Sequence, residues 1–384
     1  MENFVFSNKT ELIFGRGVEQ QVGQKVSACA KKVLLHYGGG SIKRTGLYDR
    51  ITASLRESGV DFIELGGVQP NPRVTLVRQG IELCRKEGVD FILAVGGGSV
   101  IDSAKAIGVG VPYDGDVWDF FARKAAPEAT LPVGVVLTIP AAGSESSNSM
   151  VITNEEGLLK KGYNTVLIRP QFAFLNPELT YTLPFYQTAC GASDMLAHIM
   201  ERYFTTVQHV DVSDRMCEGV MRSILFNAPI LKDQPENYDA RAEIMLAGTI
   251  AHNDSLQPGR IGDWASHGIE HELSAIYDIA HGAGLAIIFP AWMRYVYHTD
   301  INRFVQFAVR VMDVDLSFGD PEAIVEEGIR RLEAFYQRME LPIRLHEIGI
   351  DASRFEEMAQ KAAPRGAFQV LDAGDICKIF ELAL

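Results

Sequence analysis

A carboxylate and an imidazole with metal-ligand spacing occur in the second half of the sequence. Asp194 and His198 are four residues apart in segment 191–202, whose apolar spacing predicts a helix. Side chains four residues apart project from the same helix face, one turn from each other. The pair could therefore bind one cation, although an isolated Asp and His on a helix are more often surface or core residues.

A cluster of histidines follows further along the chain. Three of the nine histidines, His267, His271 and His281, lie within fifteen residues. On one continuous helix, the 281 − 267 = 14 positions between the outer two would span about 21 Å. Both can bind one metal ion only if the chain turns between them. We therefore predict that one helix ends near Tyr277 and that the next begins near His281.

These two clusters together make a plausible metal-binding set. Asp194, His198, His267 and His281 would supply one oxygen and three nitrogen ligands. Imidazoles with a carboxylate suit Fe(II), Zn(II) or a similar divalent ion, and the set does not select one of them. The alternative is a histidine cluster at the surface that binds nothing.

A second chemical motif, Gly-Gly-Gly-Ser, occurs twice, at 38–41 and 96–99. Each copy follows an expected strand and precedes an expected helix, where close backbone approach and free N–H groups favour a phosphate. We expect the second copy to hold the pyrophosphate of a dinucleotide. It is not the usual GxGxxG motif, because position 101 is Ile101, so a tight strand-to-helix turn is the alternative.

The first copy bears on the choice of nicotinamide cofactor. NAD sites usually place an acid at the end of a strand to bind the adenosine ribose, whereas the strand 32–37 ends in Gly38. Ser41, Lys43 and Arg44 follow. This environment should accept a 2′-phosphate, so we predict NADP(H), with NAD(H) as the alternative.

The order of elements predicts how these residues are positioned. Strands are expected at 32–37, 62–65, 90–95, 133–139 and 172–175, and helices at 41–58, 73–87 and 100–108, with a Gly/Ser-rich loop at 143–149. This alternation predicts an α/β domain with a mostly parallel sheet and helices on both faces. Almost everything after Leu183-Pro184 has helical period. We expect a dinucleotide-binding domain over 1–182 and an all-helical, metal-binding domain over 183–384.

Composition restricts the class of partner. The 384 residues carry a formal net charge of −13, which disfavours binding to nucleic acids or anionic membranes. The five cysteines are widely spaced and form no CxxC motif, as expected for reduced thiols. We find no signal-peptide pattern and no apolar run long enough to span a bilayer, and expect a cytoplasmic protein.

Taken together, these motifs resemble the iron-activated, group III alcohol dehydrogenases, in particular their NADP-dependent butanol dehydrogenase and aldehyde reductase branch. The resemblance covers nearly the whole chain. It rests on Gly96 to Asp102, on Pro140 to Glu145, on Asp194 with His198, and on His267, His271 and His281-Gly282. It implies the dehydroquinate synthase-like architecture.

The resemblance also implies roles for individual residues. Asp194, His198, His267 and His281 would be the metal ligands, and His271 would lie near the nicotinamide and substrate. The expected cofactor-binding residues are Gly38, Gly39, Gly40, Ser41, Asn71, Gly97, Gly98, Ser99, Asp102, Thr138 and Lys160. The chain departs from the family where a threonine-rich loop is usual, since Ala141 and Ala142 cannot donate side-chain hydrogen bonds.

The expected activity is hydride transfer between NADP(H) and a small aliphatic alcohol or aldehyde such as butanol or butanal, in a homodimer. His271 would relay the proton or else orient a ligand. A glycerol dehydrogenase and a dehydroquinate synthase-like enzyme acting on a polyhydroxylated substrate are the alternatives. The second is disfavoured because segment 262–284 contains no Lys or Arg. A metal-binding module without catalysis is the non-enzymatic alternative.

Overall fold

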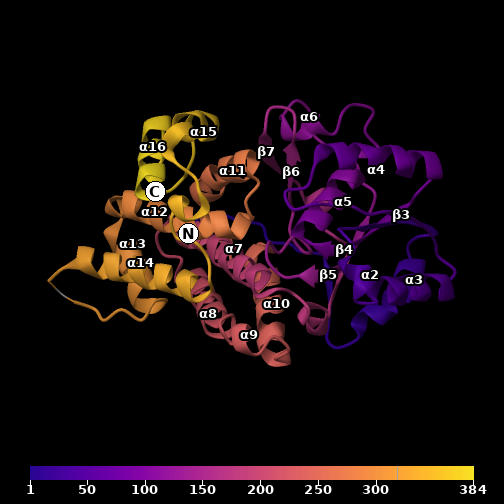
Figure 1. Ribbon diagram of the computed structural model, residues 1–384, viewed down its shortest axis with the longest axis horizontal. Helices are drawn as coiled ribbons and strands as arrows, with labels where there is room; N and C mark the ends of the chain where they lie inside the picture. Colours follow the sequence, from indigo (N-terminus) through magenta and orange to yellow (C-terminus); the bar gives the residue numbers. More distant parts are fainter. Residues whose placement is uncertain (318) are drawn as a thin grey trace. The chain divides into compact units, whose positions relative to one another are not determined.

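A computed structural model describes residues 1–384 except position 318, and the chain divides into two compact units (Figure 1). One unit is Ser7–Thr182, and the other combines Met1–Phe6 with Leu183–Leu384. The expected first domain began at residue 1, whereas the structure groups Met1–Phe6 with the helical residues that follow Thr182. The first residues are bound to helical-unit backbone: the Met1 ammonium donates to the Gln208 carbonyl at 2.9 Å, and the Glu2 N–H donates to the Gly259 carbonyl at 2.9 Å.

The α/β unit is built on a parallel sheet with strand order β1-β8-β5-β4-β2-β3. The strands are β1 Glu11–Phe14, β2 Lys32–Tyr37, β3 Asp61–Leu65, β4 Phe91–Gly97, β5 Val133–Ile139 and β8 Phe172–Leu175. The helices are α1 Val22–Ser27, α2 Ser41–Arg44, α3 Leu47–Glu57, α4 Val74–Glu87, α5 Gly98–Gly110 and α6 Trp118–Phe121. The predicted parallel α/β sheet is therefore confirmed.

Helices cover both faces of this sheet because the central strands are apolar on both sides. Val33 and Leu35 of β2 point to one face, where they join a core with residues of α1 and α3. The alternate residue His36 points to the other face, where its Nε2 is 2.9 Å from the Ser103 hydroxyl of α5. Strand β4, which precedes the second glycine triplet, is buried along its whole length.

Three local features differ from the sequence-based expectation. The helix expected over 41–58 is interrupted, since Gly46 adopts a left-handed conformation with φ 70° between α2 and α3. Strand β1 was not predicted, because it is only four residues long and its hydrogen-bonded neighbour is the distant β8. The antiparallel hairpin of β6 Ser149–Asn154 and β7 Leu159–Asn164 was also missed.

The second unit is helical, as its apolar period predicted. Its helices are α7 Phe185–Tyr203, α8 Asp211–Asn227, α9 Ile230–Asp233, α10 Tyr238–His252, α11 Ala265–Tyr277, α12 His281–Val296, α13 Ile301–Arg310, α14 Pro321–Arg338, α15 Phe355–Ala362 and α16 Ala373–Leu382. Helices α7 and α12 contribute heavily to its core, and Trp292 of α12 is fully buried.

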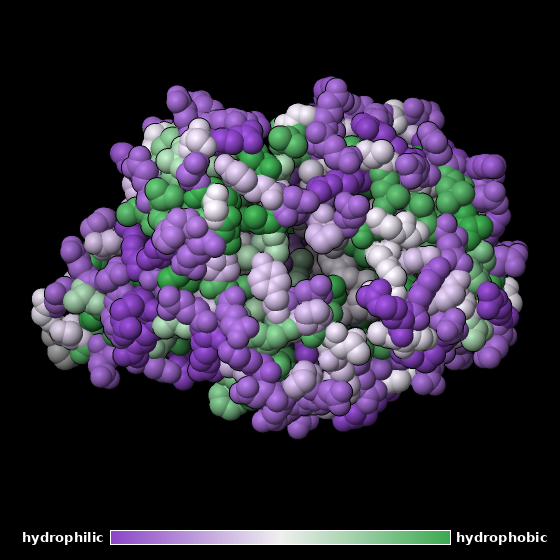
Figure 2. Space-filling view, in the orientation of Figure 1, coloured by the Kyte–Doolittle hydropathy of each residue, from purple (hydrophilic) through white to green (hydrophobic). Residues whose placement is uncertain are grey.

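The outer surface reflects the charged composition. Figure 2 shows hydrophilic residues covering most of the visible face, with smaller apolar patches between them. Within the part of the chain that the structure describes, we find no helix that is both long and apolar enough to cross a membrane.

Candidate metal centre

The four predicted ligands all lie in the helical unit, on three helices that pack against one another. Asp194 and His198 belong to the buried middle of α7, His267 to α11, and His281 is the first residue of α12. Helix α11 ends at Tyr277 because Asp278 turns into a left-handed conformation with φ 52°. The predicted break between Tyr277 and His281 is therefore confirmed.

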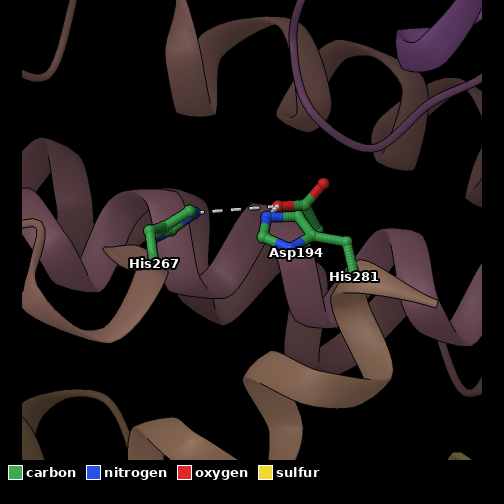
Figure 3. A group of neighbouring side chains, drawn as sticks. All are labelled: Asp194, His267 and His281. Carbon is green, nitrogen blue, oxygen red and sulfur yellow. Dashed lines mark ion pairs between the residues drawn. The ribbon is translucent and has the colours of Figure 1, made fainter. Parts of the chain in front are cut away.

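The carboxylate of Asp194 is the point on which two imidazoles converge (Figure 3). His267 Nε2 and His281 Nε2 are each 3.9 Å from Asp194 Oδ1. One potential ligand atom from each of these residues lies within 4.8 Å of the others. Ligands about 2.0–2.2 Å from a shared ion stand roughly 3–4 Å apart, so this spacing suits a single cation.

The other ring nitrogen of each imidazole has an oxygen partner. His267 Nδ1 is 2.8 Å from Glu201 Oε1, and His281 Nδ1 is hydrogen-bonded to Glu270 Oε2. His198 Nδ1 is 2.9 Å from the Asp194 carbonyl, and the same nitrogen is 3.0 Å from Asp194 Oδ1. A carbonyl or carboxylate oxygen accepts, which places the proton on Nδ1. Each Nε2 then carries the lone pair that a metal ligand requires.

Burial and charge at this point favour a bound cation. Within the described residues, His267 Nε2 is a buried atom without a hydrogen-bond partner, and the buried Asp194 Oδ1 has the His198 Nδ1 at 3.0 Å as an ion-pair partner. Burial opposes ionisation of Asp194, but His198, His281 and His267 hold its pKa well below the usual range. Burial lowers the pKa of His267, and the neighbouring imidazoles lower it further. A neutral imidazole beside an ionised carboxylate is the donor set of a divalent metal ion, so these residues fit such an ion.

His198 and His271 occupy different places around this point. The His198 ring lies 4.5 Å from the His267 ring, measured between centroids, although His198 is not in the group of three mutually close ligand atoms. The His271 ring lies 5.5 Å from the His281 ring. His271 belongs instead to an overlapping group with Glu270 and His281.

The sequence analysis missed two glutamates that position the imidazoles: Glu201, which contacts the ring of His267, and Glu270, which contacts the ring of His281. Glu201 is fully buried and accepts from the His267 N–H at 2.9 Å as well as from its ring, while its other oxygen accepts from the Trp264 N–H at 2.5 Å. Burial raises the pKa of Glu201 to about 7, against the opposing effect of these N–H groups. The sequence feature that could have identified Glu201 is its position seven residues, or about two helical turns, after Asp194 on the same predicted helix.

The second glycine triplet lies where the sequence analysis expected it. Strand β4 runs to Gly97, and the thirteen-residue α5 begins at Gly98. In the described residues no side chain caps this helix start, so its first N–H groups suit an anion. A Cβ on Gly97 would lie 2.9 Å from Ile139 Cβ, and one on Gly98 would lie 3.2 Å from Ala142 Cβ. Glycine is therefore required for packing at the first of these positions.

The first triplet differs from the expectation. It follows β2, but α2 is only four residues long, so it opens no substantial helix. A Cβ on Gly39 would meet no atom within 4 Å, which leaves the backbone open there.

The remaining predicted cofactor residues of the α/β unit are spread over several elements. Asp102 accepts from the Ser144 hydroxyl at 2.5 Å and from the Val151 N–H at 2.9 Å, so it attaches the 143–149 loop and β6 to α5. Thr138 lies near the end of β5 and Lys160 on β7. Asn71 is buried and adopts a left-handed φ of 54° just before α4, and Ser99 lies in the first turn of α5.

Comparison with known proteins gives one consistent match over both units. Residues 9–177 match the family described as iron-containing alcohol dehydrogenase, and residues 188–384 match the C-terminal domain of that family. The chain is 46% identical to "probable NADH-dependent butanol dehydrogenase 2" of Bacillus subtilis, covering 100% of both chains. It is 34% identical to the NADPH-dependent aldehyde reductase YqhD of Escherichia coli, covering 98% of this chain and 97% of that one.

The fold agrees with this match. The crystal structure of an NADH-dependent butanol dehydrogenase A from Thermotoga maritima superposes with a TM-score of 0.97 at 40% identity, covering 100% of this chain and 99% of that chain. The similarity thus extends through the α/β sheet, the helical unit and the segments that carry the three converging side chains. The chain belongs to the iron-containing alcohol dehydrogenase family.

Proposed function

We propose that this protein is a metal-dependent, NAD(P)H-linked alcohol dehydrogenase that reduces small aliphatic aldehydes and oxidises the corresponding alcohols. The observation that carries the proposal is the convergence of His267 Nε2 and His281 Nε2 on Asp194 Oδ1, each at 3.9 Å. Relatives named as butanol dehydrogenases and an aldehyde reductase support the substrate class.

The proposed ligands of the divalent ion, iron or zinc, are Asp194, His198, His267 and His281. A divalent ion held there supplies Lewis acidity to the oxygen of the alcohol or aldehyde. The chain contributes the orientation of the ligands, since Glu201 and Glu270 keep the proton on the Nδ1 atoms and direct the Nε2 atoms inward.

His271 is the proposed proton carrier between the substrate hydroxyl and water. Its ring is partly exposed and close to His281, and an imidazole accepts and releases a proton near neutral pH. The Trp264 ring, 5.5 Å from that of His267, supplies an apolar surface next to the proposed metal. A substrate with a short alkyl chain suits that apolar surface better than a polyhydroxylated substrate does.

The proposed hydride carrier is a nicotinamide dinucleotide, whose nicotinamide ring supplies or accepts the hydride. Gly97, Gly98 and Ser99 at the start of α5 would bind its pyrophosphate, and Gly38 to Ser41 would lie at its adenosine ribose. Asp102, Thr138 and Lys160, with Asn71, complete the proposed contacts. We retain NADP(H) as the preferred cofactor because β2 is followed by Gly38 and not by an acid. NAD(H) is the accepted alternative, since relatives named for NADH and for NADPH belong to the same family.

A homodimer in the cytoplasm is also part of the proposal. In the part of the chain that the structure describes, strand β1 is paired on one side only, with β8, and its Leu12 and Phe14 are 38% and 40% exposed. An exposed apolar strand edge is a natural surface for pairing with a second copy.

The test is the initial rate of NADPH and NADH oxidation with butanal, on metal-stripped protein with and without added Fe(II) or Zn(II). Activity should return only with metal. His267→Ala should lose bound metal, measured by elemental analysis, whereas the matched control His298→Ala, which changes an exposed histidine, should keep it. Activity that is indifferent to metal would refute the proposed Lewis-acid role.

A further inference from the structure

We propose that Glu64 sets the balance between NADPH and NADH by neutralising Lys43 beside the end of strand β2. The proposal deepens the proposed function and rests on it, since it concerns the adenosine end of the same dinucleotide. Sequence reasoning counted Lys43 as a cation available for a 2′-phosphate and did not consider Glu64. The structure brings the two side chains together from different elements.

The topology explains why these residues meet. Glu64 lies on β3, and its Cα is paired with that of Leu35 on the neighbouring strand β2, two residues before Tyr37. Side chains separated by two residues in a strand share one face, so Glu64 and Tyr37 project to the same side. Lys43 on α2 and Tyr48 on α3 cover that side immediately after the Gly38–Ser41 loop.

The four side chains form one closed cluster. The Tyr37 hydroxyl donates to Glu64 Oε2 at 2.8 Å, and the Tyr48 hydroxyl donates to Glu64 Oε1. The Lys43 ammonium lies 5.2 Å from the centroid of the Tyr37 ring and 4.6 Å from that of Tyr48, and its Nζ is 3.5 Å from Glu64 Oε2. Both rings and the carboxylate therefore hold the ammonium in one place, although the Lys43 side chain is 50% exposed.

The charge of this cluster decides what it can select. Lys43 and Glu64 carry opposite unit charges, so the cluster has no net charge despite its exposed ammonium. In dinucleotide-binding α/β folds the adenosine ribose lies beyond the end of the strand next to the one that leads to the pyrophosphate loop. Strand β2 pairs with β4, which leads to the Gly97-Gly98 loop, so the corresponding end here is the one marked by Tyr37. A 2′-phosphate placed there would be attracted by Lys43 and repelled by Glu64, whereas a 2′-hydroxyl would be affected little by either.

The experiment measures the dissociation constants of NADPH and NADH for the full chain by fluorescence titration at low salt. Glu64→Gln keeps the size of the side chain and removes its charge, and we expect it to raise the preference for NADPH over NADH by about 3- to 10-fold. Lys43→Met should shift the preference toward NADH by a similar factor. Glu82→Gln, which removes an exposed carboxylate on α4, is the matched control and should leave the ratio unchanged.

The proposal is tested by the ratio of the NADPH and NADH dissociation constants and by the salt dependence of that ratio. If the Glu64→Gln shift disappears at about 0.5 M salt, the effect is electrostatic, as we expect. An unchanged ratio in correctly folded Glu64→Gln, or a shift toward NADH, would overturn the role of Glu64 while leaving the proposed reaction intact. A wild-type chain that binds neither dinucleotide would instead overturn the proposed function, and this inference with it. If Glu64→Gln does not fold, Lys43→Met provides the test, because Lys43 is half exposed and its replacement should be tolerated. An unchanged ratio in Lys43→Met would mean that the Lys43 charge does not act on the 2′-phosphate, so that Glu64 has no effect to neutralise.

Discussion

Replacing Glu201 with glutamine tests whether the carboxylate behind His267 prepares the proposed metal site. Glu201 Oε1 accepts from both the main chain and the ring of His267, and Oε2 accepts from the Trp264 N–H. Glutamine has almost the same shape but only one acceptor oxygen. If that oxygen serves His267, the amide NH2 faces the Trp264 N–H, and two donors then oppose each other in a buried position.

The magnitude follows from the contacts that are lost. Removing a group that orients a metal-binding imidazole typically weakens metal binding about 10- to 100-fold. This corresponds to about 1.4–2.8 kcal/mol, within the range expected for a hydrogen bond to a charged acceptor. The proposed ligands themselves are untouched, so the Glu201→Gln protein should still bind metal stoichiometrically at saturation.

The assay is competition for Zn(II) or Co(II) between the protein and a chelating dye, with urea unfolding of the metal-free protein in parallel. Glu218→Gln is the matched control, because Glu218 is also buried in the helical unit but accepts from the Tyr203 hydroxyl and from Arg310. The control should lose stability while retaining metal affinity. A Glu201→Gln protein that is folded and binds metal within about threefold of wild type would show that the orientation argument is wrong.

Three further changes test other parts of the structure. Burial lowers the pKa of His36 to about 4, so below about pH 6.5 the unfolded chain binds the proton first, and the free energy of unfolding should fall by about 3 kcal/mol between pH 6.5 and 4. In urea unfolding His36→Asn should lack this pH-dependent loss, and a pH dependence identical to that of wild type would contradict the assignment to His36. Lys105→Met removes the buried ammonium that donates to Ser144, Ser147 and Ser149, and should lower the free energy of unfolding in urea by about 2–4 kcal/mol. An unchanged urea midpoint would exclude a stabilising role for this ammonium. Gly282→Ala would place a Cβ against the Cys190 carbonyl and force α12 away from α7, so metal binding measured by the dye assay should weaken several-fold. The control Gly219→Ala adds a Cβ in open space on α8 and should leave metal binding unchanged; equal metal affinity in both variants would contradict the packing argument.

Local patterns were sufficient where one element determines the outcome. The alternation of apolar strands and helices predicted the parallel sheet, because its central strands are buried on both faces. The distance along the chain between His267 and His281 required a break, which occurs at Asp278. Strand β1 and the β6–β7 hairpin were not predictable in this way, since short strands acquire their stability from partners that the local sequence does not name.

The sequence by itself determined which chemical groups are available: a carboxylate, three imidazoles and two glycine loops, with spacings that allow a metal ion and a dinucleotide. Tertiary structure decided how those groups are tuned. Glu201 and Glu270 orient His267 and His281 only because the packing of α7, α11 and α12 places them behind the rings. Similarly, Lys43 is neutralised because β3 pairs beside β2 and brings Glu64 to it. Hydrogen bonds and Coulomb interactions depend on separations of a few ångströms, which are set by packing between segments far apart in the chain.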